Sequence, residues 1–375
     1  MENLKMVDLH GQYLKIQNEI NEGIQEVINQ TAFINGAKVK EFAKALGDYL
    51  QSHVIPCGNG TDALQIALMA LEAEPGDEII LPVHTYVATA EVVGLLGLKP
   101  VFVDVDSELF TLDLEQTISS ISSRTKAIVP VHLYGQCADM AGLMSMTIGN
   151  DIAVIEDTAQ ALGADYIFSN GSTKKAGTIG TIGTTSFFPS KNLGCYGDGG
   201  AMMSASEELA EKLRVIANHG QYKKYHHDLI GVNSRLDTIQ AAVLLAKLPH
   251  LNSYAEARQQ VAAYYDEALK DIEAISLPKR AAYSTHVFHQ YTIKVADGKR
   301  DELKAFLASE GIPSMIYYPV PLHLQKGYQQ YGYKAGDFPV AEQLSETVLS
   351  LPIHTEMQEE QQAYICDKIH SFYKS

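Results

Sequence analysis

Short apolar runs alternate with helical patterns along the first two-thirds of the chain. Four of these runs are continuous rather than alternating, which is typical of strands that are buried on both faces of a parallel sheet. They cover residues 78–82, 101–105, 127–131 and 152–155. Because strands that alternate with helices form stacked β-α units, the pattern predicts an α/β fold with a mostly parallel sheet.

The pattern changes near residue 251, where a long amphipathic helix begins and is followed by a strand pattern at 287–293 and further short helices. We therefore predict a large domain at 1–250 and a smaller C-terminal domain at 251–375. A cluster of Ser, Asn, Gly and Thr at 169–177 predicts a surface loop or hairpin.

Polar or turn residues follow each predicted strand, at 82–85, 104–106, 132–136 and 156–157. In open α/β sheets, ligands bind outside the carboxyl ends of the strands. We therefore expect the functional site at this edge of the sheet.

Lys191 follows two phenylalanines and a proline and precedes a glycine-rich stretch at 192–200. Its ammonium is expected to be partly desolvated, which lowers the pKa of a lysine towards the nucleophilic range. The glycines allow the backbone to approach a ligand closely. A structural lysine between a strand and a turn is the alternative interpretation.

The composition describes an ordinary globular protein: 375 residues, 46% of them hydrophobic and 20% charged. No apolar run reaches membrane-spanning length and the N-terminus lacks the apolar core of a signal peptide, so we expect a cytoplasmic protein without a membrane partner. A formal net charge of −16 argues against a nucleic-acid partner. Any bound phosphate must therefore be held by local donors.

The cysteines are widely scattered and contain no C-x-x-C pair, which supports neither a zinc site nor a disulfide framework. We expect no metal and interpret all four as free thiols: Cys57, Cys137, Cys195 and Cys366.

A phosphate site is indicated where Gly60 and Thr61 begin a helix that is apolar nearly all round. Free backbone N–H groups and the positive end of the helix dipole bind phosphate there without any lysine. The alternative is an ordinary capped helix with Thr61 or Asp62 as the cap. Ser186 supplies a hydroxyl five residues before Lys191 that could contact a phosphate oxygen.

Asp157 follows a buried strand, where a carboxylate is costly unless it is paired. A protonated pyridine nitrogen would be such a partner, and capping of the next helix is the alternative. Tyr86 lies just past another strand end and could stack on a flat ring, or it could be a core tyrosine.

These groups occur in the order found in pyridoxal-phosphate enzymes of the aspartate-aminotransferase fold. Along nearly its whole length, the chain resembles the DegT/StrS family of nucleotide-sugar aminotransferases, through the motifs G-T-D-A-L, E-D-T-A-Q, S-F-F-P-S-K and G-V-N-S-R-L-D. The resemblance implies a large domain with a seven-stranded, mostly parallel sheet in an α/β/α sandwich and a smaller α+β domain.

The resemblance also implies the roles of the site residues. Lys191 would hold pyridoxal 5'-phosphate as a Schiff base, and Asp157 would pair with the pyridine nitrogen. The other cofactor residues would be Gly60, Thr61 and Ser186 at the phosphate, with Tyr86 and Gln160 at the ring. Asn233 matches the residue that reaches the cofactor phosphate of the neighbouring subunit, which implies a homodimer with shared active sites.

The implied reaction moves an amino group from an amino acid, usually L-glutamate, to a keto sugar by way of the pyridoxamine 5'-phosphate form. Lysine at position 191 argues against the dehydratase relatives, which have histidine there. The first candidate substrate is C3 of a UDP-2-acetamido-2-deoxy-3-oxo-glucuronate, for cell-surface polysaccharide or lipopolysaccharide (O-antigen) biosynthesis. The alternatives are a dTDP-3-keto-6-deoxyhexose 3-aminotransferase and a non-catalytic, cofactor-binding regulatory protein.

Candidate substrate ligands are weaker. Arg235 could contact a diphosphate or a uronate carboxylate, or it could pair with Asp237. The remaining candidates come from one tract of the C-terminal part: Tyr317, Tyr318 and His323.

Overall fold

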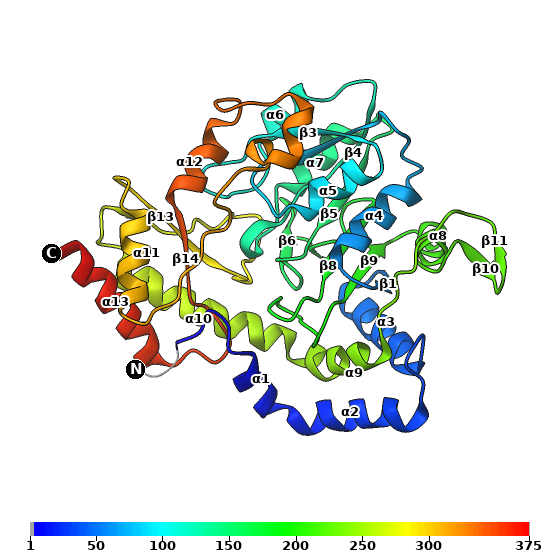
Figure 1. Ribbon diagram of the computed structural model, residues 1–375, viewed down its shortest axis with the longest axis horizontal. Coiled ribbons are helices and arrows are strands. Elements are labelled where there is room, and N and C mark those ends of the chain that lie inside the picture. The colour runs from blue at the N-terminus through cyan, green and yellow to red at the C-terminus, as the bar shows by residue number, and fades with distance from the viewer. Residues whose placement is uncertain (1–3, 375) are drawn as a thin grey trace.

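A computed structural model describes residues 4–374 and is built around a seven-stranded sheet (Figure 1). The strand order is β1-β9-β8-β5-β4-β2-β3. The strands span His53–Cys57 (β1), Glu78–Pro82 (β2), Lys99–Val103 (β3), Thr125–Ile128 (β4), Ala153–Asp157 (β5), Ile182–Ser186 (β8) and Gly200–Ser204 (β9). Only β9 runs against its neighbours, since it pairs antiparallel with β1 and β8 while the other pairs are parallel. The predicted mostly parallel sheet is confirmed.

The four strands predicted from the apolar runs are all present, and three of them have shifted ends. β2 coincides with its run, whereas β3 begins and ends two residues earlier than expected. β4 ends at Ile128, although Val131 still forms an isolated bridge with Asp157. Pro130 lies between them and has no N–H to donate, so the regular ladder stops there.

Helices cover both faces of the sheet and give the expected α/β/α layers (Figure 1). One face packs against α4 (Gly60–Ala70), α5 (Ala88–Leu95) and α8 (Glu207–Ala217). The other face packs against α3 (Ala37–Leu50), α7 (Met140–Thr147) and α9 (Thr238–Lys247). The remaining helices of this part are α1 (Leu9–Lys15), α2 (Gln17–Gln30) and α6 (Leu114–Ser119).

The C-terminal part has its own antiparallel sheet of three strands, β12 (Ile275–Ser276), β13 (Tyr291–Val295) and β14 (Val348–Leu351). Its helices are α10 (Leu251–Leu269), α11 (Arg300–Ser309), α12 (Pro339–Thr347) and α13 (Glu359–Lys374). Leu4 packs in the core of this sheet, while Leu251 packs in the core beside α3 and α9. The division of the chain at residue 250 stays a prediction.

Two hairpins lie outside the main sheets. β6 (Asp165–Ile167) pairs with β7 (Thr173–Lys175), which confirms the hairpin expected around 169–177. β10 (Gln221–Lys223) and β11 (His226–His227) form a second hairpin that projects away from the body of the protein (Figure 1). The four cysteines are free, as predicted, and all four are buried. Among residues 4–374, no helix has the length and apolar character that a membrane span requires.

A buried carboxylate fixes the end of β5. Glu156 is 0% exposed, and its oxygens accept hydrogen bonds from three backbone N–H groups of the 177–180 turn at 2.6–2.9 Å. His132 Nε2 lies 2.9 Å from the same carboxylate, and Ala138 N–H donates to His132 Nδ1, so Nε2 is the ring's donor. Burial would raise the pKa of Glu156, but these hydrogen bonds hold it below its usual value. Glu156 therefore joins β5 to two distant segments.

Replacing Glu156 by Gln should destabilise the protein strongly. The new amide places an NH2 group among donors and leaves some of them unpaired, which should cost about 3 kcal/mol of unfolding free energy. Urea denaturation of the apo-protein measures this change. The control is Glu273→Gln, because Glu273 is exposed. Equal midpoints for the two variants would contradict the anchoring role of Glu156.

Candidate active site

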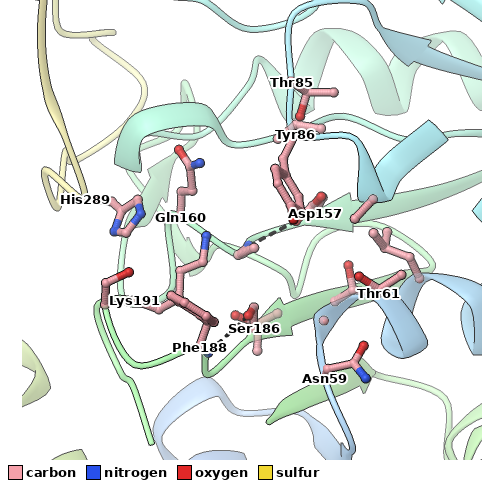
Figure 2. Close-up of a pocket in the computed structure, with 18 of the residues that line it drawn as sticks. Asn59, Thr61, Thr85, Tyr86, Asp157, Gln160, Ser186, Phe188, Lys191 and His289 are labelled. Atoms are coloured by element: carbon pink, nitrogen blue, oxygen red, sulfur yellow. Dashed lines mark hydrogen bonds between the residues drawn. The ribbon is translucent and has the colours of Figure 1, made fainter. Parts of the chain in front are cut away.

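A cavity of about 640 Å³ lies at the carboxyl ends of the central strands (Figure 2). It is lined by the N-terminus of α4, the ends of β5 and β8, and segments of the C-terminal part at 289–290 and 317–318. The cavity is therefore at the edge of the sheet where the sequence places the functional site.

The N-terminus of α4 meets the end of β8 across a very short gap. A Cβ added to Gly60 would lie 2.8 Å from the Cβ of Ser186, so only glycine fits at this position. Asn59 caps the helix, since its side chain accepts a hydrogen bond from Asp62 N–H at 2.8 Å. Thr61 and Asp62, which sequence reasoning considered as caps, instead lie in the first turn.

This junction has the features of a phosphate site. Gly60, Thr61 and Ser186 all line the cavity. The first N–H groups of a helix have no acceptor within the helix, and its dipole favours an anion at this end. The residues predicted to hold the cofactor phosphate are thus brought together.

Lys191 enters the cavity from a tight turn after β8, in which its N–H donates to the carbonyl of Phe188 at 2.8 Å. Figure 2 shows its amine pointing into the space between Gln160 and Asp157. Burial lowers the pKa of Lys191 to about 8, although the carboxylate of Asp157 opposes that shift. The predicted desolvated lysine is therefore present and faces an acid.

Asp157 is 7% exposed and is held by two hydrogen bonds. Thr89 Oγ1 donates to Oδ2 at 3.1 Å, and Ala159 N–H donates to Oδ1 at 3.1 Å. Each carboxylate oxygen keeps a further lone pair for a ligand. Asp157 can therefore accept a hydrogen bond from a protonated ring nitrogen without leaving its position.

Gln160 is fixed on both sides of its amide. Its Oε1 accepts from Tyr134 N–H at 2.7 Å, and its Nε2 donates to the hydroxyl of Tyr318 at 3.2 Å. The Tyr86 ring is 57% exposed at the cavity, with its centroid 6.1 Å from that of Tyr318. Tyr86 has an open face on which a flat ring can stack.

The structure brings Tyr317 and Tyr318 to the cavity but not the other predicted substrate ligands or Asn233. His323 is buried with Nε2 3.0 Å from Glu342 Oε1. Asn233 is exposed, and Arg235 is partly exposed outside the cavity lining. The intervening Ser234 contacts Asp62 Oδ2 at 2.6 Å, so this segment passes beside the N-terminus of α4.

Sequence reasoning missed several lining residues. Asn59 had a signal, since an asparagine directly before a helix is a preferred cap. His289 and Gln290 had none, because only tertiary packing brings them to the cavity. Thr89 does not line the cavity, but it was missed as the partner of Asp157 for the same reason.

A sequence model of the DegT/DnrJ/EryC1/StrS aminotransferase family matches residues 14–370. The chain belongs to this family.

Four relatives illustrate its range. The chain is 47% identical over 375 residues to the "Pleiotropic regulatory protein" of Geobacillus stearothermophilus, with 99% of each chain covered. It is 45% identical over 368 residues to a UDP-N-acetyl-3-dehydro-alpha-D-glucosamine 3-aminotransferase of Acidithiobacillus ferrooxidans, covering 98% of this chain and 97% of the relative. It is 44% identical over 352 residues to a UDP-2-acetamido-2-deoxy-3-oxo-D-glucuronate aminotransferase of Pseudomonas aeruginosa, covering 94% and 95%. A dTDP-3-amino-3,4,6-trideoxy-alpha-D-glucose transaminase of Streptomyces venezuelae is 37% identical over 364 residues, covering 97% and 94%.

Solved structures agree with the fold. A family aminotransferase from Brucella abortus has a TM-score of 0.93 and 43% identity, with 100% of both chains covered. NtdA from Bacillus subtilis, solved with bound cofactor PMP, has a TM-score of 0.91 and 29% identity, with 100% of this chain and 86% of that chain covered. The predicted fold, enzyme class and cofactor are confirmed: the chain is a pyridoxal-phosphate-dependent sugar aminotransferase.

The cavity fits that cofactor. Gly60 lies so close to Ser186 that no side chain fits between them, and this contact brings the N-terminus of α4 and the Ser186 hydroxyl to one place on the cavity wall, where both can contact a phosphate. Asp157 offers an acceptor for the ring nitrogen, and Lys191 offers an amine of lowered pKa. When bound, the cofactor supplies an electron sink for the reacting carbon.

Borohydride reduction of the holoenzyme should fix a pyridoxyl group on Lys191 and on no other lysine, as read by peptide mass spectrometry.

The rate at which apo-protein takes up the cofactor should rise from about pH 7 to about pH 9, because a lysine with a pKa near 8 loses its proton and becomes nucleophilic over that range.

Lys247 is the internal control. Burial lowers its pKa to about 8 as well, but its Nζ donates to the carbonyl of Gly194 at 2.8 Å and it does not line the cavity. A pyridoxyl group on Lys247, or full uptake and turnover by Lys191→Ala, would contradict the assignment.

Proposed function

We propose that this enzyme transfers the amino group of L-glutamate to C3 of a UDP-linked 2-acetamido-2-deoxy-3-keto hexose. Two relatives at 44–45% identity are named for UDP-linked 3-keto sugars, whereas the dTDP-sugar transaminase of Streptomyces venezuelae is 37% identical. The observation that carries an aminotransferase reaction is the Lys191 amine opposite Asp157 in one cavity.

The residues of this chain divide the work. Asp157 keeps the ring nitrogen protonated, because a carboxylate favours the charged form of a neighbouring base. Lys191 takes the proton from Cα of L-glutamate in the first half of the reaction and delivers a proton to C3 of the sugar in the second half. A pKa near the working pH suits a group that both accepts and donates a proton. Gly60, Thr61 and Ser186 would hold the phosphate and so set the position of the ring relative to Asp157 and Tyr86.

The first candidate for the sugar is UDP-2-acetamido-2-deoxy-3-oxo-D-glucuronate. Its C6 carboxylate requires a cationic partner. Among the described residues that line the cavity, the basic side chains are Lys191 and His289, and Lys191 is committed to the cofactor. We therefore propose that Arg235 of a second copy supplies the partner and that the enzyme works as a homodimer with shared sites.

We place the reaction in the cytoplasmic synthesis of cell-surface polysaccharide or lipopolysaccharide, such as O-antigen. Amination of a dTDP-3-keto-6-deoxyhexose is the alternative reaction. A regulatory role without catalysis is the remaining alternative, and the name of the Geobacillus relative is the observation that favours it. Lys191, Asp157 and the phosphate junction are all intact, which favours catalysis.

A substrate panel tests the proposal. The pyridoxamine form of the enzyme, mixed with UDP-2-acetamido-3-keto-glucuronate, the corresponding 6-hydroxy sugar or a dTDP-3-keto-6-deoxyhexose, should lose its cofactor absorbance fastest with a UDP sugar. Arg235→Gln should slow the glucuronate selectively, about tenfold for one charge-assisted hydrogen bond. Fastest turnover of the dTDP sugar would support the alternative, and no turnover of any keto sugar would support the regulatory role.

Mixing a variant with weakened cofactor retention, Asn233→Ala, with an inactive variant, Lys191→Ala, tests the shared site. If Asn233 reaches the partner's cofactor phosphate, Asn233→Ala chains mixed with Lys191→Ala chains form heterodimers in which one site carries both lesions and the other carries neither. Activity should then return on mixing, up to about half of the native value per heterodimer. Heterodimers that form without any recovery would place Asn233 in its own subunit's site or outside the site.

A further inference from the structure

A second, smaller hollow of about 330 Å³ adjoins the cavity. The two share one wall, because Ser190, His289, Gln290 and Tyr317 line both. The other lining residues are apolar and come from the N-terminal segment and from β14 and the residues after it: Met6, Val7, Leu9, Leu351 and Ile353. The hollow therefore has a polar mouth and an apolar end.

The mouth contains polar atoms that the protein leaves unsatisfied. His289 and Gln290 are 8% and 7% exposed, and His289 Nδ1 and Gln290 Oε1 have no hydrogen-bond partner among the described residues. Unpaired buried polar atoms are costly, and native proteins seldom keep them without a reason. The Gln290 side chain already forms a hydrogen bond with Tyr317, so its unpaired Oε1 is the atom that can accept a hydrogen bond from a ligand.

The protonation state of His289 limits the chemical class of ligand that the hollow can bind. Burial lowers its pKa well below the usual value, and the charges of Lys191 and Arg258 lower it further. The ring is thus uncharged at neutral pH and can donate or accept one hydrogen bond at each nitrogen. No lysine or arginine lines the hollow among residues 4–374, so a carboxylate would lack a charged partner there.

The position of the hollow relates it to the reacting carbon. Ser190 lines it and directly precedes Lys191. A substituent on a carbon bonded to the one that reacts at Lys191 is close enough to enter such a neighbouring space. In the sugar of the proposed function, the carbons next to C3 carry the acetamido group (C2) and a hydroxyl (C4), and only the acetamido group has a methyl that suits the apolar end of the hollow.

We propose that this hollow is the subsite for the C2 acetamido group of the sugar, with Gln290 and His289 as its polar ligands and the Met6–Val7 segment as part of its apolar end. The amide N–H donates to Gln290 Oε1, the carbonyl accepts from the His289 ring, and the methyl group lies among the apolar side chains. This subsite rests on the proposed function, and it selects an acetamido sugar over one with a hydroxyl at C2.

The test compares two ligands that differ only at C2. Binding of UDP-N-acetylglucosamine and UDP-glucose to the holoenzyme is measured by calorimetry, and kcat/KM is measured for the corresponding 3-keto sugars. The native enzyme should prefer the acetamido member of each pair. Gln290→Leu should reduce that preference about tenfold, the value of one hydrogen bond of about 1.4 kcal/mol.

Val7→Phe fills the hollow from a partly exposed position, so it tests the same idea without a change in the wall. It should also reduce the preference for the acetamido ligand. The matched control is Leu14→Phe at an exposed site on α1, which should leave the preference unchanged.

Three results would overturn the subsite. Native turnover of the acetamido sugar with an unchanged preference in both variants would remove the subsite and leave the proposed function intact. A higher KM for L-glutamate in Val7→Phe, with the sugar preference unchanged, would assign the hollow to the amino donor. Absence of native turnover with any acetamido sugar would remove the proposed function and the subsite together.

Discussion

A carboxylate buried inside a sheet has to find its hydrogen bonds within the protein, and Glu156 finds them in two segments that are distant in sequence. Side chains alternate along a strand, so the next residue, Asp157, points to the opposite face and lines the cavity. The hydrogen bonds that anchor Glu156 thereby also fix the direction of Asp157, the acid that we propose pairs with the ring nitrogen. Thr89 and Ala159 complete this by holding the two carboxylate oxygens.

Two buried lysines show why position, rather than pKa alone, makes an active-site amine. Burial lowers the pKa of both Lys191 and Lys247 to about 8. Lys247 donates a hydrogen bond to the carbonyl of Gly194, and its Nζ lies over the ring of Tyr196, 4.7 Å from the ring centroid. It thus stabilises the turn that follows Lys191. Lys191 points into open space beside Asp157 and remains available for chemistry.

Most of the fold and the cofactor site could be predicted from the sequence, because their determinants are local. Continuous apolar runs predicted β2, β3, β4 and β5, and Gly60, Asp157 and Lys191 lie at a strand end or within five residues after one, where α/β sheets bind ligands. The predicted ends of β3 and β4 were wrong by two or three residues. For β4, the ladder stops before Pro130, and Val131 pairs only through an isolated bridge with Asp157, a contact that depends on the neighbouring strand. His289 and Gln290 could not be predicted as lining residues, because their place at the cavity follows from the packing of the C-terminal part. Asn233 and Arg235 lie outside the cavity of one chain, so the roles that we propose for them require a second copy.

The residues near strand ends and the residues on connecting segments differ in a way that explains why the reaction is easier to predict than the substrate. The groups proposed to hold the cofactor lie near strand ends and at a helix N-terminus, and their geometry is set by backbone hydrogen bonds of the sheet and by the Asn59 cap. The groups available to a sugar sit on connecting segments, with Tyr317, Tyr318, His289 and Gln290 reaching the cavity from the C-terminal part and Met6 and Val7 reaching the adjoining hollow from the N-terminus. Connecting segments tolerate change without loss of the core. A family can therefore keep one reaction at the sheet while its members differ in the sugar that they accept. For this chain, we expect sugar selectivity to depend on the wall that the cavity shares with the adjoining hollow.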